Sequence, residues 1–287
     1  MTATRMSARA SSGFFAHLNP FALVRRLATQ HELLWQFTLR NFGLKHKGTN
    51  LGFSWAVFNP LLLLGLYFVV FGKILPGHFG AIPNETPVDV ALALLVGLTV
   101  FHFLAEIIGQ SPMIIVGNVN LVKKVVFPLE VLPLANLGAC FFNFLISLGL
   151  VLLGQILFGR GLFVSACWTL ALIPPVVFLG AGLAWALAAL GVFFRDLTQF
   201  SQFLTLVLMY VSAVFFPSAR IQQLPSLWAV LRFNPVLQII EMLRDSLLWD
   251  RPIHLGHLGW LYLGSAAICL VGYASFAALR SSFSDVL

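Results

Sequence analysis

Few residues of this chain stand at spacings that support catalysis or metal binding. Its ten acidic residues and seven histidines are scattered along 287 positions. His102 and Glu106 lie four residues apart, on one face of a helix, where a carboxylate within a membrane indicates either a functional site or an interhelical hydrogen bond. His254 and His257 have a ligand-like spacing, without a set of cysteine or carboxylate partners to complete a site. We predict no catalytic residues and no metal site.

The chain also lacks the signatures of hydrolases and of nucleotide binding. Neither His-Glu-x-x-His nor Gly-x-Ser-x-Gly occurs. Gly72-Lys73 is not a phosphate-binding loop, because position 67 is Tyr instead of Gly and Ile74 follows the lysine. We expect no cofactor in this chain, so that any ATP used must be bound by another chain.

Aromatic residues gather in two apolar runs, around positions 67–71 and 200–216. A flat ring can stack on the apolar C–H face of a sugar, and Tyr adds a hydroxyl group. A pore with such a lining would let a glycan slide without gripping it. The alternative is that these rings face lipid or pack helices together. The candidate channel residues are Tyr67, Phe68, Phe71, Phe203 and Tyr210.

Composition sets the class of protein that must position these residues. The chain is 59% hydrophobic and 9% charged, with a mean hydropathy of +0.93, whereas soluble domains carry about 25% charged residues. Its long apolar runs predict membrane-spanning helices instead of a barrel. The net charge of +7 does not indicate nucleic acid, because seven of the 17 Lys and Arg residues precede residue 48, beside the first apolar run.

The pattern predicts an all-α polytopic membrane protein with six transmembrane helices in residues 51–287. A flexible tail, 1–19, precedes them. Prolines 174 and 175 are expected to break or bend the long run in which the fourth span lies. The excess of basic residues before the first span places both termini in the cytoplasm. The predicted spans cover residues 54–75, 88–110, 132–158, 168–193, 199–216 and 256–279.

Residues 20–50 predict an amphipathic helix lying at the cytoplasmic face of the membrane. Arg25, Gln36 and Arg40 fall on one side of this helix, and Leu34 and Phe37 fall mainly on another. A soluble helix packed on the protein's own loops would have the same pattern.

Two segments between spans are neither tight turns nor solvated tails. Residues 111–133 carry lysines and prolines within an apolar sequence, which fits a short interfacial helix stopped by Pro128, or a surface loop marking the cytoplasmic side. Residues 217–251 contain apolar runs that are too short to cross a bilayer of about 30 Å. We predict a re-entrant helical pair on the outer side, with two ordinary amphipathic helices as the alternative.

Four segments carry a resemblance to a known family: residues 45–60 (KHKGTNLGFSWAVFNP), 120–134 (NLVKKVVFPLEVLPL), 191–197 (GVFFRDL) and 233–248 (FNPVLQIIEMLRDSLL). In this order they resemble the approach to the first span, the loop after the second, the turn between spans four and five, and the outer re-entrant segment of polysaccharide ABC exporter permeases. These permeases belong to the ABC transporter type-2 family. Within it, the O-antigen and teichoic-acid permeases are the most similar.

The resemblance implies a homodimer in the bacterial inner membrane, paired with two copies of an ATPase that binds ATP and Mg. The substrate would be a lipid-linked polysaccharide leaving the cytoplasm through a pore between the two copies. Arg195 and Asp196 would line the pore entrance or anchor the helix end at the interface; a plain flank of the span is the alternative. The residues implied in coupling to the ATPase are Asn118, Asn120, Lys123, Lys124, Phe127 and Pro128.

Three other functions remain open at the level of sequence. An ABC permease for a drug or another lipid would share these features. A membrane-embedded glycan-processing enzyme would need an acid–base cluster, which the sequence does not show. An ion-coupled carrier would bury charges at the membrane centre, and five of the six predicted spans are almost free of them.

Overall fold

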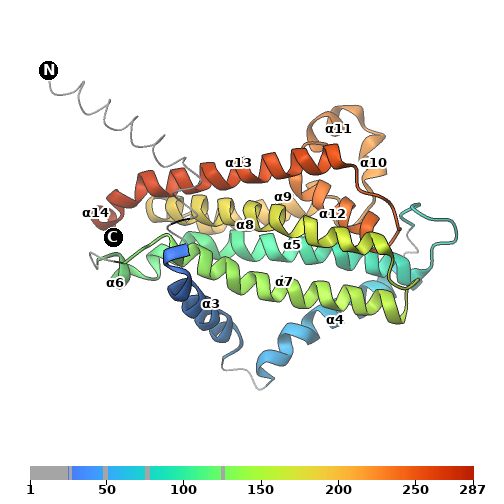
Figure 1. Cartoon of the computed structure of the whole chain (residues 1–287), viewed down its shortest axis with the longest axis horizontal. Coiled ribbons are helices and arrows are strands. Elements are labelled where there is room, and N and C mark those ends of the chain that lie inside the picture. The colour runs from blue at the N-terminus through green and yellow to red at the C-terminus, as the bar shows by residue number, and fades with distance from the viewer. Residues whose placement is uncertain (1–24, 26–27, 48–50, 75–77, 124–126) are drawn as a thin grey trace.

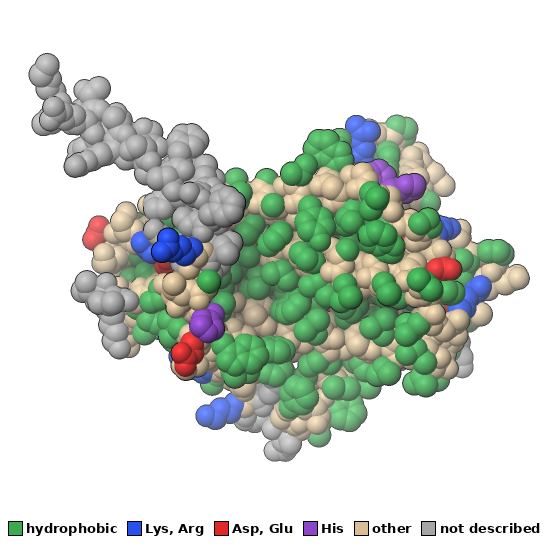
Figure 2. Space-filling model, viewed as in Figure 1, with side chains coloured by type: hydrophobic (Ala, Val, Ile, Leu, Met, Phe, Trp, Pro, Cys, Tyr) green, Lys and Arg blue, Asp and Glu red, His purple; other side chains and the backbone are tan. Residues whose placement is uncertain are grey.

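The computed structural model describes residue 25 and residues 28–47, 51–74, 78–123 and 127–287. Within this part every regular element is a helix, and five helical stretches are long and apolar enough to cross a membrane. Charged side chains collect mainly toward the two ends of the molecule, with a broad hydrophobic band between them (Figure 2). The chain is therefore a multi-pass membrane protein. The five stretches are Gly52–Val69, Pro87–Val116, Val131–Leu157, Val164–Phe193 and Leu255–Val286.

Helix α5, Pro87–Val116, forms the centre of the bundle (Figure 1). Its apolar residues surround the helix instead of forming one stripe, which is the pattern of a helix covered on all sides. It packs against α4 (Trp55–Val69), α7 (Val131–Leu157), α8 (Trp168–Phe193) and α9 (Leu197–Val211). The helix begins at a capping box in which Thr86 and Asp89 bond to each other's backbone N–H groups, followed by Pro87 at the first position.

Small residues bring the helices close together, as is usual where lipid removes most of the hydrophobic drive for association. Gly182 of α8 lies against Gly272 of α13, Leu255–Leu279, and a Cβ atom on either glycine would clash with the facing backbone. Gly180 lies on roughly the opposite side of α8, against Ile107 of α5 and Leu137 of α7. Helix α8 is thereby held between two sides of the bundle.

The structure differs from the six-span prediction in two places. The predicted fifth span, 199–216, contains α9, which has 15 residues, a length of about 22 Å, and so falls short of the bilayer core. The prolines of the fourth span do not break it: α8 runs unbroken through Pro174 and Pro175. Packed neighbours and local adjustment make such prolines tolerable in membrane helices.

Residues 217–251 hold three helices instead of the predicted pair: α10 (Ser218–Gln222), α11 (Pro225–Leu231) and α12 (Pro235–Leu247). Only α12 is deeply packed, against α5 and α8. It starts at Asn234, whose side chain accepts a hydrogen bond from the Val236 N–H at 3.0 Å. This segment lies at the opposite end of the bundle from the C-terminus (Figure 1).

Two helices lie at the edge of the main bundle. Helix α3, His31–His46, crosses obliquely beneath the end where the C-terminus lies and packs on α7 (Figure 1). Its Leu34 and Phe37 face the core, while Trp35 and Leu39 on other sides are exposed. Helix α4 diverges from the bundle, and almost none of it is buried in the single chain.

Candidate functional site

The connection between α5 and α7 is shorter than the predicted loop 111–133. Helix α5 continues to Val116 and α7 begins at Val131. The Asn118 side chain donates to the Ile114 carbonyl at 2.8 Å, at the start of the four-residue helix α6, Val119–Val122. Asn120 and Lys123 are exposed on this turn, whereas Lys124 lies outside the described residues. The described part of the connection therefore forms a tip beyond the end of the long helix, at which the polar side chains of Asn120 and Lys123 are exposed.

Phe127 links this connection to α3. Its ring lies 5.6 Å, centre to centre, from the ring of Phe37 in α3. The guanidinium group of Arg40 stacks over the same Phe37 ring at 4.2 Å. Pro128, which follows, is half-buried. Through this ring contact, a displacement of Phe127 would also move α3.

A polar cluster fastens α3 to the bundle. The interhelical hydrogen bond considered above for Glu106 is part of it, but the sequence did not indicate its partners. Lys45 Nζ lies 2.8 Å from Glu106 Oε1 of α5 and 3.3 Å from Cys140 Sγ of α7. Asn143 of α7 donates to Glu106 at 3.4 Å. Of the two interpretations of the His102 and Glu106 pair, these contacts fit the interhelical hydrogen bond at Glu106, while His102 is exposed. Because Lys45 and Glu106 are 61 positions apart, no local spacing could have paired them.

A second ion pair ties the end of the chain to the same side of the molecule. Arg280, just after α13, donates to buried Glu130 at 2.8 Å. The Glu130 carbonyl accepts from the Trp185 indole N–H at 3.1 Å. The start of α7, the last turns of α8 and the end of α13 are joined here.

Arg195 and Asp196 are exposed in the turn between α8 and α9. Within the described residues neither forms an ion pair. The Asp196 carbonyl accepts the N–H groups of Gln199 and Phe200 at 3.1 Å, which starts α9. Both side chains are therefore accessible on the surface of this turn.

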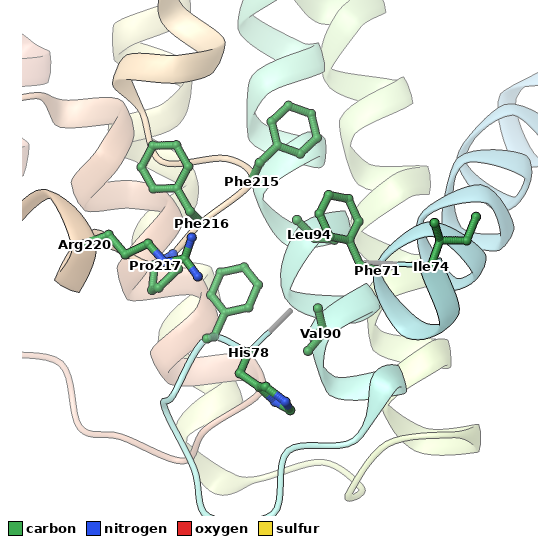
Figure 3. A pocket seen from close by; sticks show the side chains of 10 residues that line it. Phe71, Ile74, His78, Val90, Leu94, Phe215, Phe216, Pro217 and Arg220 are labelled. Carbon is green, nitrogen blue, oxygen red and sulfur yellow. The ribbon is translucent and has the colours of Figure 1, made fainter. Parts of the chain in front are cut away.

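The predicted aromatic residues divide into two sets. Tyr67 of α4 and Phe71 of the π-helical turn that follows it, Val70–Ile74, lie 6.0 Å apart, and Tyr67 lies 5.8 Å from Phe215, just after α9. Phe71 and Phe215 line a groove of about 350 Å³ near the α10 end of the molecule. Figure 3 shows their rings with Phe216 and the Arg220 side chain around this groove.

The second set remains exposed. Phe203 and Tyr210 of α9 are 60% and 56% exposed, and Phe68 of α4 is 36% exposed. Phe203 has Phe200 beside it at 6.4 Å. No ring contact joins Phe203 or Tyr210 to the aromatic residues of α4 in the described part of the chain.

Arg244 of α12 is the most constrained charged residue in the described structure, and sequence reasoning missed it. Its side chain is 0% exposed. It donates to the carbonyls of Ala93, Ala213 and Val214 at 3.0, 3.0 and 2.7 Å, and to Glu241 Oε1 at 3.0 Å. The guanidinium group thereby joins α12 to the second turn of α5 and to the chain where α9 has ended. Its place on the apolar face of α12, four residues after Ile240, was the signal available in the sequence.

Gly97 of α5 makes room for this guanidinium group. A Cβ atom there would lie 2.8 Å from Arg244 Nη2 and 3.0 Å from the Val214 carbonyl. We expect Gly97→Ala to lower the free energy of unfolding by about 1–3 kcal/mol, the usual cost of overpacking. Gly109→Ala in the same helix meets no atom within 4 Å and is the matched control. Denaturation of the purified variants in detergent checks this, and equal stability of the two variants would contradict it.

No group of three or more His, Cys, Asp or Glu residues suited to a metal ion occurs in the part of the chain that the structure describes. His254 and His257 lie 5.7 Å apart, ring to ring, without further ligands of this kind. The notable features of the described structure are thus the tip that exposes Asn120 and Lys123, the aromatic groove and the buried Arg244 with its partner Glu241.

Comparison with known proteins identifies the family. Two O-antigen export system permease proteins RfbA of Klebsiella pneumoniae are 27% and 26% identical to this chain, over 89% of it and 95% of each relative. The protein of the same name from Myxococcus xanthus is 28% identical over 76% of this chain and 81% of its own length. The family model described as ABC-2 type transporter matches residues 32–248. Since that match covers most of the chain, the protein belongs to the ABC-2 type transporter family of membrane permeases.

Proposed function

We propose that this chain is the membrane subunit of an ATP-driven exporter that moves a lipid-linked, O-antigen-like polysaccharide out of the cytoplasm across the bacterial inner membrane. Two copies of the chain form the pore, and two copies of a separate ATPase supply the energy. The chain itself catalyses no covalent step. The observation that carries the proposal is the similarity to O-antigen export permeases over nearly their whole length.

Coupling to the ATPase is assigned to the connection between α5 and α7. Its exposed residues Asn120 and Lys123 stand at the end of the 30-residue helix α5. A rigid helix that continues into a compact tip can transmit a displacement along its axis. The contact of Phe127 with Phe37 extends that displacement to α3, which we place at the cytoplasmic face of the membrane.

The pore is assigned to the side of the molecule that carries α4 and α9. In the single chain α4 leaves large side chains uncovered, including Leu62 at 61% and Leu66 at 55% exposure, and α9 leaves Phe203 and Tyr210 uncovered. A second copy placed there would cover part of this surface and face the two aromatic sets toward each other. The α10–α12 segment, half-inserted from the outer side, then lies beside the exit, and Arg195 and Asp196 lie near the entrance.

The proposal predicts that aromatic residues along this path matter to export more than to folding. We expect Tyr67→Ala and Tyr210→Ala each to slow export about tenfold, because stacking on a sugar and a hydroxyl hydrogen bond together contribute on the order of 1–2 kcal/mol per ring. Surface polysaccharide and the amount of folded protein are measured in the same cells. Trp260→Ala on α13, where the ring is 73% exposed, is the control. Parallel losses of export and protein would make these residues packing residues.

Reconstitution tests the function as a whole. The chain is purified with the ATPase that co-purifies with it, placed in vesicles and supplied with lipid-linked polysaccharide on the ATPase side. ATP-dependent appearance of polysaccharide on the other side is the expected result. Transport that proceeds without the ATPase but stops when the proton gradient is removed would instead establish an ion-coupled carrier.

A further inference from the structure

A second groove, of about 370 Å³, lies between α3, the C-terminal part of α5 and the N-terminal part of α7. It is separate from the aromatic groove and lies at the other end of the bundle. Arg40 and Lys45 of α3, Gln110 of α5 and Asn136 of α7 are among the residues that line it. All four carry N–H donors. Gln110 and Lys45 already contact Glu106, at 3.3 and 2.8 Å, so Arg40 and Asn136 are the donors that favour an occupant accepting hydrogen bonds.

Asn136 has an unmet hydrogen-bonding need. The residue is only 6% exposed, and its amide nitrogen has no hydrogen-bond partner among the described residues. A buried N–H without an acceptor is unfavourable. Asn136 lines the groove, so a small rotation about its side-chain bonds turns this N–H toward the groove. An acceptor bound there would satisfy it.

The charge of the groove favours an anion. The charge of Lys45 is offset by Glu106, 2.8 Å away. Arg40 forms no ion pair with any described carboxylate and rests over the ring of Phe37. One positive charge therefore remains uncompensated at the groove, on a guanidinium fork that matches the oxygens of a phosphate group.

The edge of the groove is apolar, which favours a lipid over a free ion as its occupant. Leu44 and Met113 line it and are 56% and 50% exposed. We propose that this groove binds the phosphate group of an anionic membrane lipid, with Arg40 and Asn136 holding the phosphate oxygens and the acyl chains lying over Leu44 and Met113. Since three helices contribute, the bound lipid fastens α3 to the bundle. This site is independent of the proposed cargo.

Binding of phosphatidylglycerol to the purified full-length chain in detergent tests the site. Native mass spectrometry gives the affinity for wild type, Arg40→Gln, Asn136→Leu and Arg232→Gln. Arg232 is the matched control, because it too is exposed and stacks on a phenylalanine, Phe233, at 4.6 Å, away from the groove. We expect Arg40→Gln and Asn136→Leu each to weaken binding about tenfold, the loss of one charge-assisted hydrogen bond. Arg232→Gln will leave binding unchanged.

Thermal melting separates this site from a structural role. Asn136→Leu removes an unpaired buried amide, so the variant will melt no lower than wild type in lipid-free detergent while binding phosphatidylglycerol less well. Equal affinity in wild type, Arg40→Gln and Asn136→Leu would overturn the proposal. Stabilisation by millimolar inorganic phosphate that Arg40→Gln abolishes, with unchanged phosphatidylglycerol binding, would also overturn the lipid assignment and leave a soluble phosphate as the occupant.

Discussion

Replacing both Lys123 and Lys124 with glutamate is expected to reduce export of the polysaccharide at least about tenfold while the permease stays folded in the membrane. Lys123 is exposed on the turn after α6, with no ion pair among the described residues to be lost on substitution. The effect must then arise at the contact with the ATPase, where reversing charge on a docking surface costs several kcal/mol. The effect is measured as stimulation of the ATPase in the reconstituted complex, compared between the wild-type permease and the variant.

The control for this prediction reverses charge elsewhere on the surface. Arg232→Glu alters an exposed residue at the end of the bundle away from the α5–α7 connection and should leave stimulation of the ATPase intact. Stimulation that is normal in the Lys123→Glu, Lys124→Glu variant would remove this connection from the coupling mechanism. A variant that fails to reach the membrane is set aside in favour of Asn120→Asp, which adds a single negative charge at the same tip.

Replacing Arg244 with methionine is expected to lower the free energy of unfolding by about 3–5 kcal/mol, the range seen when one partner of a buried charged contact is removed. The substitution keeps an unbranched chain but removes every donor to Ala93, Ala213 and Val214. It also leaves Glu241 with Ser218 as its remaining described partner, at 2.9 Å. Denaturant unfolding in detergent, followed by tryptophan fluorescence, measures the loss.

Two further variants separate the causes. Arg232→Met changes the same residue type at an exposed position and should cost less than about 0.5 kcal/mol, as surface substitutions do. Arg244→Lys keeps the charge without the planar fork and should lie between wild type and Arg244→Met. Equal stability of Arg244→Met and Arg232→Met would mean that α12 is held in place by its apolar contacts alone.

The long helices were predictable because residues next to each helix end determine where the helix begins and stops. The predicted second span begins at 88 and α5 at Pro87, next to the capping residue Thr86. The predicted fourth span and α8 share both limits, 168 and 193. Continuous apolar sequence bounded by capping residues, prolines or charges is the strongest local signal that a membrane helix provides.

The end of α9 was not predictable in the same way. Hydrophobic sequence continues through Val214 and Phe215, so the pattern extends the span to 216. The helix stops at Val211, and Ala213 turns with a φ angle of 53°. The carbonyls of Ala213 and Val214 are satisfied by Arg244, 31 and 30 positions away. A turn that depends on so distant a donor leaves no trace in the local sequence.

Only those parts of the candidate site that depend on local sequence could be predicted. Composition and motifs indicated the polar connection and the aromatic runs, and the structure places Tyr67 near Phe215. The partners of Glu106 and Arg244 lie on other helices, which only tertiary packing brings close. Phe203 and Tyr210 remain uncovered in one chain, so their role depends on a second copy that sequence alone cannot place.

The location of finished polysaccharide after depletion of this protein in its native cell tests the proposed function most directly. Lipid-linked polysaccharide inside the cell and polysaccharide at the surface are extracted separately and compared before and after depletion. Export by this permease predicts that full-length, lipid-linked polymer accumulates in the cytoplasm while surface polymer declines. Normal surface polymer in fully depleted cells would contradict the account and leave a family permease for another lipid or a drug.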